Sequence, residues 1–500
     1  MHTSVATFAL EGVDSRQVAV EVDVRRGLPT FTVVGLPDAA VREARERVRA
    51  AVLNSGLDFP LSRVTANLAP ADIRKSGPSF DLALAIGVLA ASGQVPADAA
   101  RDCAVCGELS LGGALRPIRG ALAMAAGARA AGISRLVVPV QNGEEASLVE
   151  GVRILPVPNL AAMAALLRGE CDPEPPRRRP PAPRPPGPDL SDVRGQADAR
   201  RALEIAAAGG HSLLLVGPPG AGKTMLARRL PGILPEPGFD EAMEITRIRS
   251  VAGLGDGSLA LDRPFRAPHH TISASGLVGG GSVPRPGELT LAHRGVLFLD
   301  EMAEFSRHAL EALREPLEAG RVSVTRGQRT LDFPARVMLV GACNDCPCGR
   351  REGTCQCAAV DLARYSRRLS GPVLDRIDLV CRLDPAPPPS DGHEPPGEAT
   401  DAVRGRVAAA RELQSARLRG AAHCNSEMDP RTTYRTVRVE PRAFRALASS
   451  PGFASLTGRG HDRVLRVART IADLEGCHQV SGDHIQEAIG FRVSRSLEMV

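Results

Sequence analysis

Aromatic residues are scarce in this sequence, which has no Trp, two Tyr and 12 Phe among its 500 residues. Proteins that grip single-stranded nucleic acid commonly stack its bases on aromatic side chains. The scarcity therefore disfavours a base-stacking platform. Any nucleic acid that this protein binds is expected to be held through its backbone.

Long hydrophobic runs are also missing. No uninterrupted apolar stretch approaches the ~20 residues that span a bilayer. The opening residues MHTSVATFALEGVDSRQ have neither the basic start nor the apolar core of a signal peptide. We therefore expect a cytoplasmic protein with no membrane partner, and in that location the eleven cysteines favour reduced thiols or a metal site over disulfides.

An excess of charge of one sign is missing as well. The net charge of +5 is too small to indicate a polyanionic partner by itself. A hydrophobic content of 43% and a charged content of 24% are typical of a soluble globular chain. Since 500 residues exceed what one hydrophobic core usually serves, we expect about three domains.

The most specific motif is GPPGAGKT at Gly217–Thr224, which follows the apolar run Ser212–Val216 and precedes Met225–Leu230. A strand, a glycine-rich turn and a helix in this order form a phosphate-binding loop, or P-loop, whose backbone N–H groups surround a phosphate chain. Lys223 is expected to reach the outer phosphates, and Thr224 to ligate Mg²⁺. The predicted ATP-binding residues are Gly217, Pro218, Pro219, Gly220, Ala221, Gly222, Lys223, Thr224 and Met225.

A second apolar run, Gly295–Leu299, ends in the acidic pair Asp300-Glu301. A buried strand that ends in two carboxylates is typical of the other half of such a site. Asp300 is expected to hold the Mg²⁺ shell together with Thr224, and Glu301 to polarise the attacking water.

The first third of the chain alternates strand and helix patterns and resembles the proteolytic domain of Lon proteases. The resemblance rests on Lys75–Asp81 (KSGPSFD), Gly107–Ser110 (GELS) and Pro117–Leu122 (PIRGAL). Ser79 matches the nucleophile of that family, but Leu122 stands where the family carries its lysine base. Since a serine without a base is unreactive, we expect a Lon-like fold without peptidase activity.

Three further residues match positions of the AAA+ ATPases. Asn344 follows the predicted strand Arg336–Gly341 and resembles the polar residue that lies between the acidic pair and the γ-phosphate. Arg376, in the segment SGPVLDRID, resembles the arginine finger that is donated to a neighbouring subunit. Arg459, in LTGR, resembles a second phosphate-sensing arginine, with Arg466 and Arg469 as further candidates.

Two inserts distinguish this ATPase core. The first runs from Arg263 to Glu288 and contains the pair His269-His270, for which a structural role is favoured over metal binding because adjacent side chains point in different directions. The second, Arg321–Phe333, predicts a strand, a tight turn and a second strand. Its arginines are Arg321, Arg326 and Arg329.

Together, the Lon-like front and the segments APHHT, VGGG, RPGE, GVLFLDE and SGPVLDRIDL resemble the magnesium-chelatase-like AAA+ ATPases, and within them the ComM/YifB group. The resemblance implies ATP and Mg²⁺ as cofactors and a hexameric ring that moves branched DNA during uptake and recombination. The hairpin arginines favour DNA, because a loop that threads protein usually presents an aromatic side chain. The alternative is a chelatase- or chaperone-type ATPase that remodels protein clients.

Four cysteines follow Asn344 in two CxC pairs, Cys346/Cys348 and Cys355/Cys357. Four thiolates at this spacing would close a tetrahedral Zn²⁺ site and pin a loop beside the active site. Reduced cysteines in a packed loop are an equally good interpretation. The separate pair Cys103/Cys106 is expected in the core.

The fold class is therefore expected to be α/β, with a Lon-like α/β domain, a P-loop AAA+ core and a C-terminal helical lid. The proline-rich stretches predict extended connections between these parts. The predicted boundaries are 1–170 for the Lon-like domain, 171–189 for a Pro/Arg-rich linker, 190–384 for the ATPase core, 385–399 for a connector and 400–500 for the lid.

Overall fold

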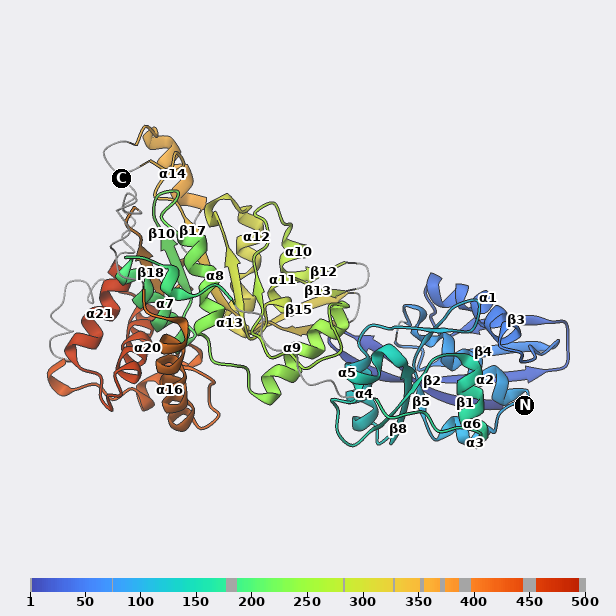
Figure 1. The fold of residues 1–500 in the computed structure, drawn as a ribbon. Coiled ribbons are helices and arrows are strands. Elements are labelled where there is room, and N and C mark those ends of the chain that lie inside the picture. The colour runs from blue at the N-terminus through green and yellow to red at the C-terminus, as the bar shows by residue number, and fades with distance from the viewer. Residues whose placement is uncertain are drawn as a thin grey trace. The chain divides into compact units, whose positions relative to one another are not determined.

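The computed structural model describes residues 2–73, 75–176, 187–281, 284–326, 329–350, 355–368, 374–385, 397–443 and 456–493. They form two compact units. The first takes its described residues from 1–183 and 239–261, and the second from 184–238 and 262–500. Each unit is built on its own sheet (Figure 1). Every helix among the described residues is too short or too polar to cross a membrane.

The first unit contains a seven-stranded mixed sheet with the order β3-β4-β2-β1-β5-β8-β9. Every second residue of β2 from Val18 to Val22 lies in the core, namely Val18, Val20 and Val22. This is the period of a strand with one buried face. The strands are β1 (His2–Glu11), β2 (Asp14–Arg25), β3 (Thr30–Val34), β4 (Arg63–Ala69), β5 (Ala104–Val105), β8 (Arg135–Pro139) and β9 (Arg153–Val157), and β6 (Glu108–Leu109) pairs with β7 (Leu115–Arg116) apart from this sheet.

Helix α2 (Asp81–Ala91) is the centre of this unit, because every one of its residues is buried. Gly87 permits its close approach to the sheet, since a Cβ atom there would lie 2.5 Å from Cγ2 of Val22. Its first residue, Asp81, is buried and accepts two hydrogen bonds from the Arg47 guanidinium at 2.9 and 3.0 Å. The other helices of this part are α1 (Ala39–Asn54), α3 (Ala97–Arg101), α4 (Ala121–Ala130), α5 (Gly143–Ala146) and α6 (Leu160–Arg168).

Helix α9 (Phe239–Ala252) belongs to the first unit although the chain reaches it from the P-loop helix. Arg247 forms an ion pair with Asp14 at 2.7 Å. The Ser250 carbonyl accepts the Gly120 N–H at 3.1 Å, at the start of α4. Residues 239–261 fall within the predicted ATPase core, 190–384, but group with the first unit in the structure. The chain consequently passes between the two units after residues 183, 238 and 261.

Two positions bear on the sequence resemblance of this unit. Leu122 lies on α4 and is 1% exposed, so the position of the family's lysine base is a core position here. Cys103 and Cys106 are buried, which confirms their predicted place in the core, and burial raises the pKa of each thiol to about 11.

The second unit is built on a five-stranded sheet in which every pairing is parallel, with the order β11-β14-β17-β10-β18. The residues of β10, β14 and β17 are all buried, as expected for a sheet covered by helices on both faces. The strands are β10 (Leu213–Val216), β11 (Phe265–Arg266), β14 (Val296–Leu299), β17 (Met338–Cys343) and β18 (Leu379–Arg382).

Along the chain, the helices around this sheet lie before its first strand and between its successive strands, as expected of an α/β core (Figure 1). Two small hairpins stand apart from it, β12 (Gly279–Gly280) with β13 (Arg285–Pro286), and β15 (Arg321–Arg326) with β16 (Arg329–Pro334). The second confirms the two predicted strands of this insert, and the predicted turn at 327–328 lies outside the described residues. The helices are α7 (Ala197–Gly209), α8 (Lys223–Ile233), α10 (Ala274–Val278), α11 (Glu288–Leu291), α12 (Arg307–Ala312), α13 (Arg314–Ala319) and α14 (Ala359–Arg368).

The described residues after 397 contain four α-helices: α16 (Thr400–Leu418), α17 (Pro430–Thr436), α20 (Gly458–Leu474) and α21 (Gly482–Val493). Helices α16 and α20 pack on α7, and their apolar side chains join one core with those of β10 and α8. The mixed α/β class with a parallel sheet agrees with the predicted AAA+ core.

Candidate nucleotide-binding site

The P-loop connects the end of β10 to the start of α8, as its sequence predicts. Gly220 and Gly222 have φ angles of 79° and 91°, which favour glycine because a Cβ atom is strained in this region. The Gly217 N–H donates to the carbonyl of Cys343, at the end of β17, at 3.2 Å. The loop is thereby fixed to the neighbouring strand, with the N-terminus of α8 available to an anion.

Lys223 is held at the centre of the site by three acceptors. Its Nζ donates to the carbonyl oxygens of Gly217 at 2.6 Å and Pro218 at 2.9 Å, and to Oδ1 of Asn344 at 3.0 Å. Burial lowers the pKa of the Lys223 ammonium, and the carboxylates of Asp300 and Asp345 act against that shift. The P-loop lysine and the predicted asparagine therefore meet.

The strand order explains this meeting. Strand β17 lies between β10 and β14, and the carboxyl ends of parallel strands gather at one edge of a sheet, where α/β proteins bind ligands. Thr224 lies on the helix after β10 and Asp300 follows β14, and the Thr224 hydroxyl donates to Oδ2 of Asp300 at 2.7 Å. A hydroxyl and a carboxylate in contact are oxygen donors of the kind that Mg²⁺ prefers.

Glu301 follows Asp300 in an unusual backbone conformation. Its φ is 50°, which costs a residue other than glycine about 1 kcal/mol or more. Its side chain is 61% exposed, so its carboxylate is accessible to water. A strained residue at the end of a central strand is typical of an active site.

His270 approaches Glu301 from the first insert, with its Nδ1 3.6 Å from Oε2 of Glu301. Its ring also contacts His269, at 4.2 Å between centroids, and the edge of Phe305. Sequence reasoning favoured a structural role for the histidine pair and missed this contact. Thirty-one positions separate His270 from Glu301 in the printed sequence, and no local pattern joins them.

The two arginines predicted to sense phosphate contact the same carboxylate, that of Glu318 on α13. Nη2 of Arg376 lies 2.6 Å from Oε1 of Glu318, and Nη1 of Arg459 lies 3.6 Å from the same atom. The Arg376 side chain is 7% exposed and also donates to the carbonyl of Arg314 at 2.9 Å, whereas the Arg459 side chain is 74% exposed. The structure brings the two arginines together.

The further candidates on α20 have contacts within the C-terminal helices. Arg469 is 2% exposed and bonds Asp473 and the carbonyls of His478 and Cys477. Arg466 donates to the carbonyl of Ser426 at 2.6 Å. Arg469 therefore has a structural role in this arrangement.

Three protein-family models match three separate segments of the chain. Residues 189–389 match "Magnesium chelatase, subunit ChlI", residues 20–142 match "Subunit ChlI of Mg-chelatase", and residues 397–492 match "Magnesium chelatase, subunit ChlI C-terminal".

Full-length relatives decide the family. The chain is 42% identical to the uncharacterized protein YifB of Escherichia coli over 98% of this chain and 96% of YifB. It is 44% identical to an uncharacterized protein of Mycobacterium tuberculosis, over 97% of each. It is 41% identical to the competence protein ComM of Haemophilus influenzae, over 98% of this chain and 97% of ComM.

The chain belongs to the magnesium-chelatase-like ComM/YifB family. This confirms the resemblance drawn from the motifs. In this family member, the predicted DNA-contacting hairpin is described in part. Arg321 is exposed at the start of β15, and Arg326 pairs with Arg329 in backbone register at the tip. The side chains of Arg326 and Arg329 lie outside what the structure describes, and all three DNA contacts stay predictions.

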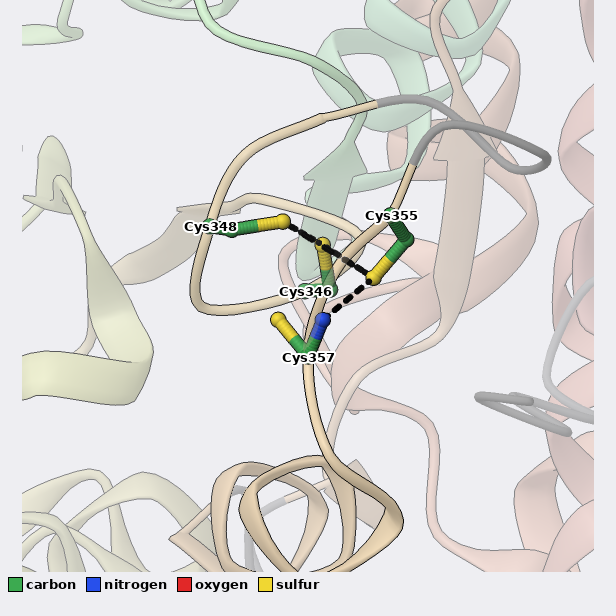
Figure 2. Close-up of side chains that lie close together, drawn as sticks. All are labelled: Cys346, Cys348, Cys355 and Cys357. Atoms are coloured by element: carbon green, nitrogen blue, oxygen red, sulfur yellow. Dashed lines mark hydrogen bonds between the residues drawn. The ribbon is translucent and has the colours of Figure 1, made fainter.

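The four cysteines of this family member form a cluster in the segment after β17 (Figure 2). Their sulfur atoms all lie within 4.8 Å of one another. Sγ of Cys346 is 3.3 Å from that of Cys348 and 3.6 Å from that of Cys355. The backbone N–H groups of Arg350 and Gln356 lower the pKa of the Cys348 thiol to about 6. The two CxC pairs, which are separate in sequence, therefore form one group.

Proposed function

We propose that this protein is an ATP-hydrolysing ring motor that moves along DNA. The contact of the Lys223 ammonium with both the P-loop and Asn344 carries the proposal. It is supported by the Thr224–Asp300 contact, because P-loop, acidic strand end and polar sensor then share one edge of the sheet. Membership of a magnesium-chelatase-like ATPase family agrees with ATP as the substrate.

ATP would lie with its phosphates over the P-loop N–H groups and the N-terminus of α8, which favour negative charge. Lys223 would contact the outer phosphates, in exchange for part of its bonds to the Gly217 and Pro218 carbonyls. Thr224 and Asp300 would hold Mg²⁺, and the ion would supply positive charge to neutralise the charge that develops on the phosphates.

Glu301 would orient and deprotonate the attacking water, and Asn344 would fix the γ-phosphate relative to it. A positioned general base contributes typically 10²–10⁴-fold to rate. The exposed carboxylate of Glu301 has the access to water that this role needs.

Arg376 and Arg459 would bind phosphate in a ring. Because both contact Glu318, we propose that they approach the same nucleotide, bound by a neighbouring subunit. Guanidinium groups suit this role because they stay charged and bind phosphate in a bidentate manner. Glu318 would hold them when no nucleotide is near.

The DNA part of the proposal is supported by the exposed Arg321 on the β15–β16 hairpin and by a relative named as a competence protein. By analogy with the family, we propose a hexamer that moves branches during recombination. The alternative, an ATPase that remodels protein clients or assists metal insertion, is supported by the match to the magnesium chelatase subunit models.

The test is ATP hydrolysis by the purified protein without DNA and with duplex, single-stranded and four-way-junction DNA. Junction exchange and oligomeric state with ATP are measured in parallel. The proposal expects a ring, turnover stimulated by the junction, and branch movement.

Two variants make the test specific. Glu301→Gln should bind ATP and assemble but not hydrolyse it, whereas Glu315→Gln, an exposed acidic residue on α13, should behave as the wild type. Turnover indifferent to every DNA would reject the DNA motor and favour protein clients.

A further inference from the structure

The spacing of the cysteine cluster matches the size of a metal ion. Four thiolates bind Zn²⁺ at ≈ 2.3 Å in a tetrahedron, which sets sulfur–sulfur distances of about 3.8 Å. The observed distances are 3.3 Å for Cys346–Cys348, 3.6 Å for Cys355–Cys346 and 3.7 Å for Cys348–Cys355. The Cys357 sulfur completes the group within 4.8 Å of the others (Figure 2). Small movements would therefore bring all four to a single ion.

The geometry points to one structural Zn²⁺ bound by the two CxC pairs, which positions Asn344 in the nucleotide site. Four protein thiolates leave no open position on the metal, which is the mark of a structural site. The ligand set also excludes hard cations such as Mg²⁺ and Ca²⁺, which take oxygen ligands. Supporting bonds of the kind that orient metal ligands are present, because the Cys357 N–H donates to the Cys355 sulfur at 3.5 Å.

The cluster lies directly on the P-loop. Gly349, in the loop after Cys348, has a φ of 67°. A Cβ atom built there would lie 2.7 Å from Cγ of Pro219. The loop that carries two of the metal ligands therefore packs against the phosphate-binding loop with no room for a side chain.

The cluster is also linked to Asn344 at two points, through the chain before Cys346 and through the helix after Cys357. Cys346 lies two residues after Asn344, and α14 begins at Ala359, two residues after Cys357. From α14, the hydroxyl of Tyr365 returns to donate to the Asn344 carbonyl at 3.1 Å. A metal that joins the two CxC pairs would thus fix both segments that hold Asn344 against Lys223.

This positioning role rests on the proposed ATPase function, but the metal site itself does not. Another potential ligand group exists among the described residues, Glu475, Cys477 and His484. It offers three ligands of mixed type, and His484 is already bonded to Glu475 at 2.9 Å. We favour the four-cysteine group because it supplies a full tetrahedral set of thiolates.

The first experiment measures zinc per chain in full-length protein purified without chelator. It also measures the absorption of a Co²⁺-substituted sample for tetrahedral thiolate ligation. Wild type and Cys171→Ser, an exposed cysteine of the first unit, should hold one zinc each.

Cys348→Ser and Cys357→Ser should lose the zinc while circular dichroism shows a folded protein. Metal-free wild type from zinc-supplemented medium would overturn the site. The proposed site would also be overturned if both variants kept their zinc and Cys477→Ser lost it.

The second experiment tests the link to Asn344. Cys348→Ser should lower ATP turnover by about 10–100-fold, the usual cost of losing a group that orients active-site ligands, with ATP affinity little changed. Unchanged turnover in a zinc-free variant would overturn the positioning role. A wild type that binds zinc but hydrolyses no ATP would instead reject the proposed function and leave the metal site standing.

Discussion

Replacing Arg469 with alanine is expected to destabilise the C-terminal helices, whereas replacing Arg459 is expected to slow ATP hydrolysis in a folded protein. The two arginines lie on the same helix, α20, and sequence reasoning considered both as phosphate sensors. Their surroundings differ, so their substitutions should give opposite profiles.

The magnitude for Arg469 follows from its burial. Its side chain is 2% exposed and bonds Asp473, itself 2% exposed, and two backbone carbonyls. Removing one partner from a buried charged network typically costs ~3–5 kcal/mol. For the second unit, residues 184–238 and 262–500, that corresponds to a fall in melting temperature of roughly 5–8 °C.

The magnitude for Arg459 is small for stability. Its side chain is 74% exposed, and its ion pair with the half-exposed Glu318 spans 3.6 Å. Such surface pairs contribute about 0–1 kcal/mol. If Arg459 contacts phosphate in the transition state, its loss should cost ~10²–10³ in turnover, as for other preorganised charge-stabilising groups.

The assay combines thermal unfolding followed by circular dichroism with ATP turnover at 25 °C. Arg431→Ala, an exposed arginine at α17, serves as the control and should change neither quantity. An Arg469→Ala protein with wild-type melting temperature would refute the reasoning from burial. An Arg459→Ala protein with wild-type turnover would refute the sensor role.

Three other predictions concern the rest of the chain. Burial lowers the pKa of His211, and its partner Asp378 acts against that shift. His211 therefore contributes its full stability to the fold above the unfolded pKa of about 6.5. This contribution is lost as the pH falls below that value, because the unfolded chain then binds a proton more readily than the folded one. Urea unfolding at pH 7.5 and 5.5 should therefore show a larger loss for wild type than for His211→Gln, and equal losses would contradict it. Gly349→Ala should lower ATP affinity without loss of zinc, because its Cβ atom would lie 2.7 Å from Cγ of Pro219 in the P-loop. Titration with a fluorescent nucleotide measures the affinity, and an unchanged value would show that this contact is unimportant. Protease cleavage at a site engineered into the 171–189 linker should leave the two fragments associated on gel filtration, because residues 239–261 of the C-terminal fragment belong to the first unit. Separate elution of the N-terminal fragment would contradict this grouping.

Much of the local structure could be predicted from the sequence. The strands of the β15–β16 hairpin, Arg321–Arg326 and Arg329–Pro334, fall within a residue of the predicted segment Arg321–Phe333. The P-loop also occupies the strand-turn-helix context that GPPGAGKT demands. These features depend on backbone preferences of neighbouring residues, which a sequence displays directly.

The sequence does not show in the same way which residues far apart in the chain contact each other. Helix α9 follows the P-loop helix along the chain, and its position in the sequence does not show that it packs in the first unit. The same holds for the contact of His270 with Glu301 and for the shared carboxylate of Arg376 and Arg459. Each depends on where separate elements meet after folding.

The sequence by itself therefore determined the motifs of the candidate nucleotide-binding site and the family of the chain, because the decisive residues stand in short, contiguous motifs. Tertiary structure alone decided that Lys223 meets Asn344, that two CxC pairs become one cluster, and that residues 239–261 belong to the first unit. The physical reason is that a side chain's preference for burial or charge does not specify its partner. The order of parallel strands and the packing of helices select that partner.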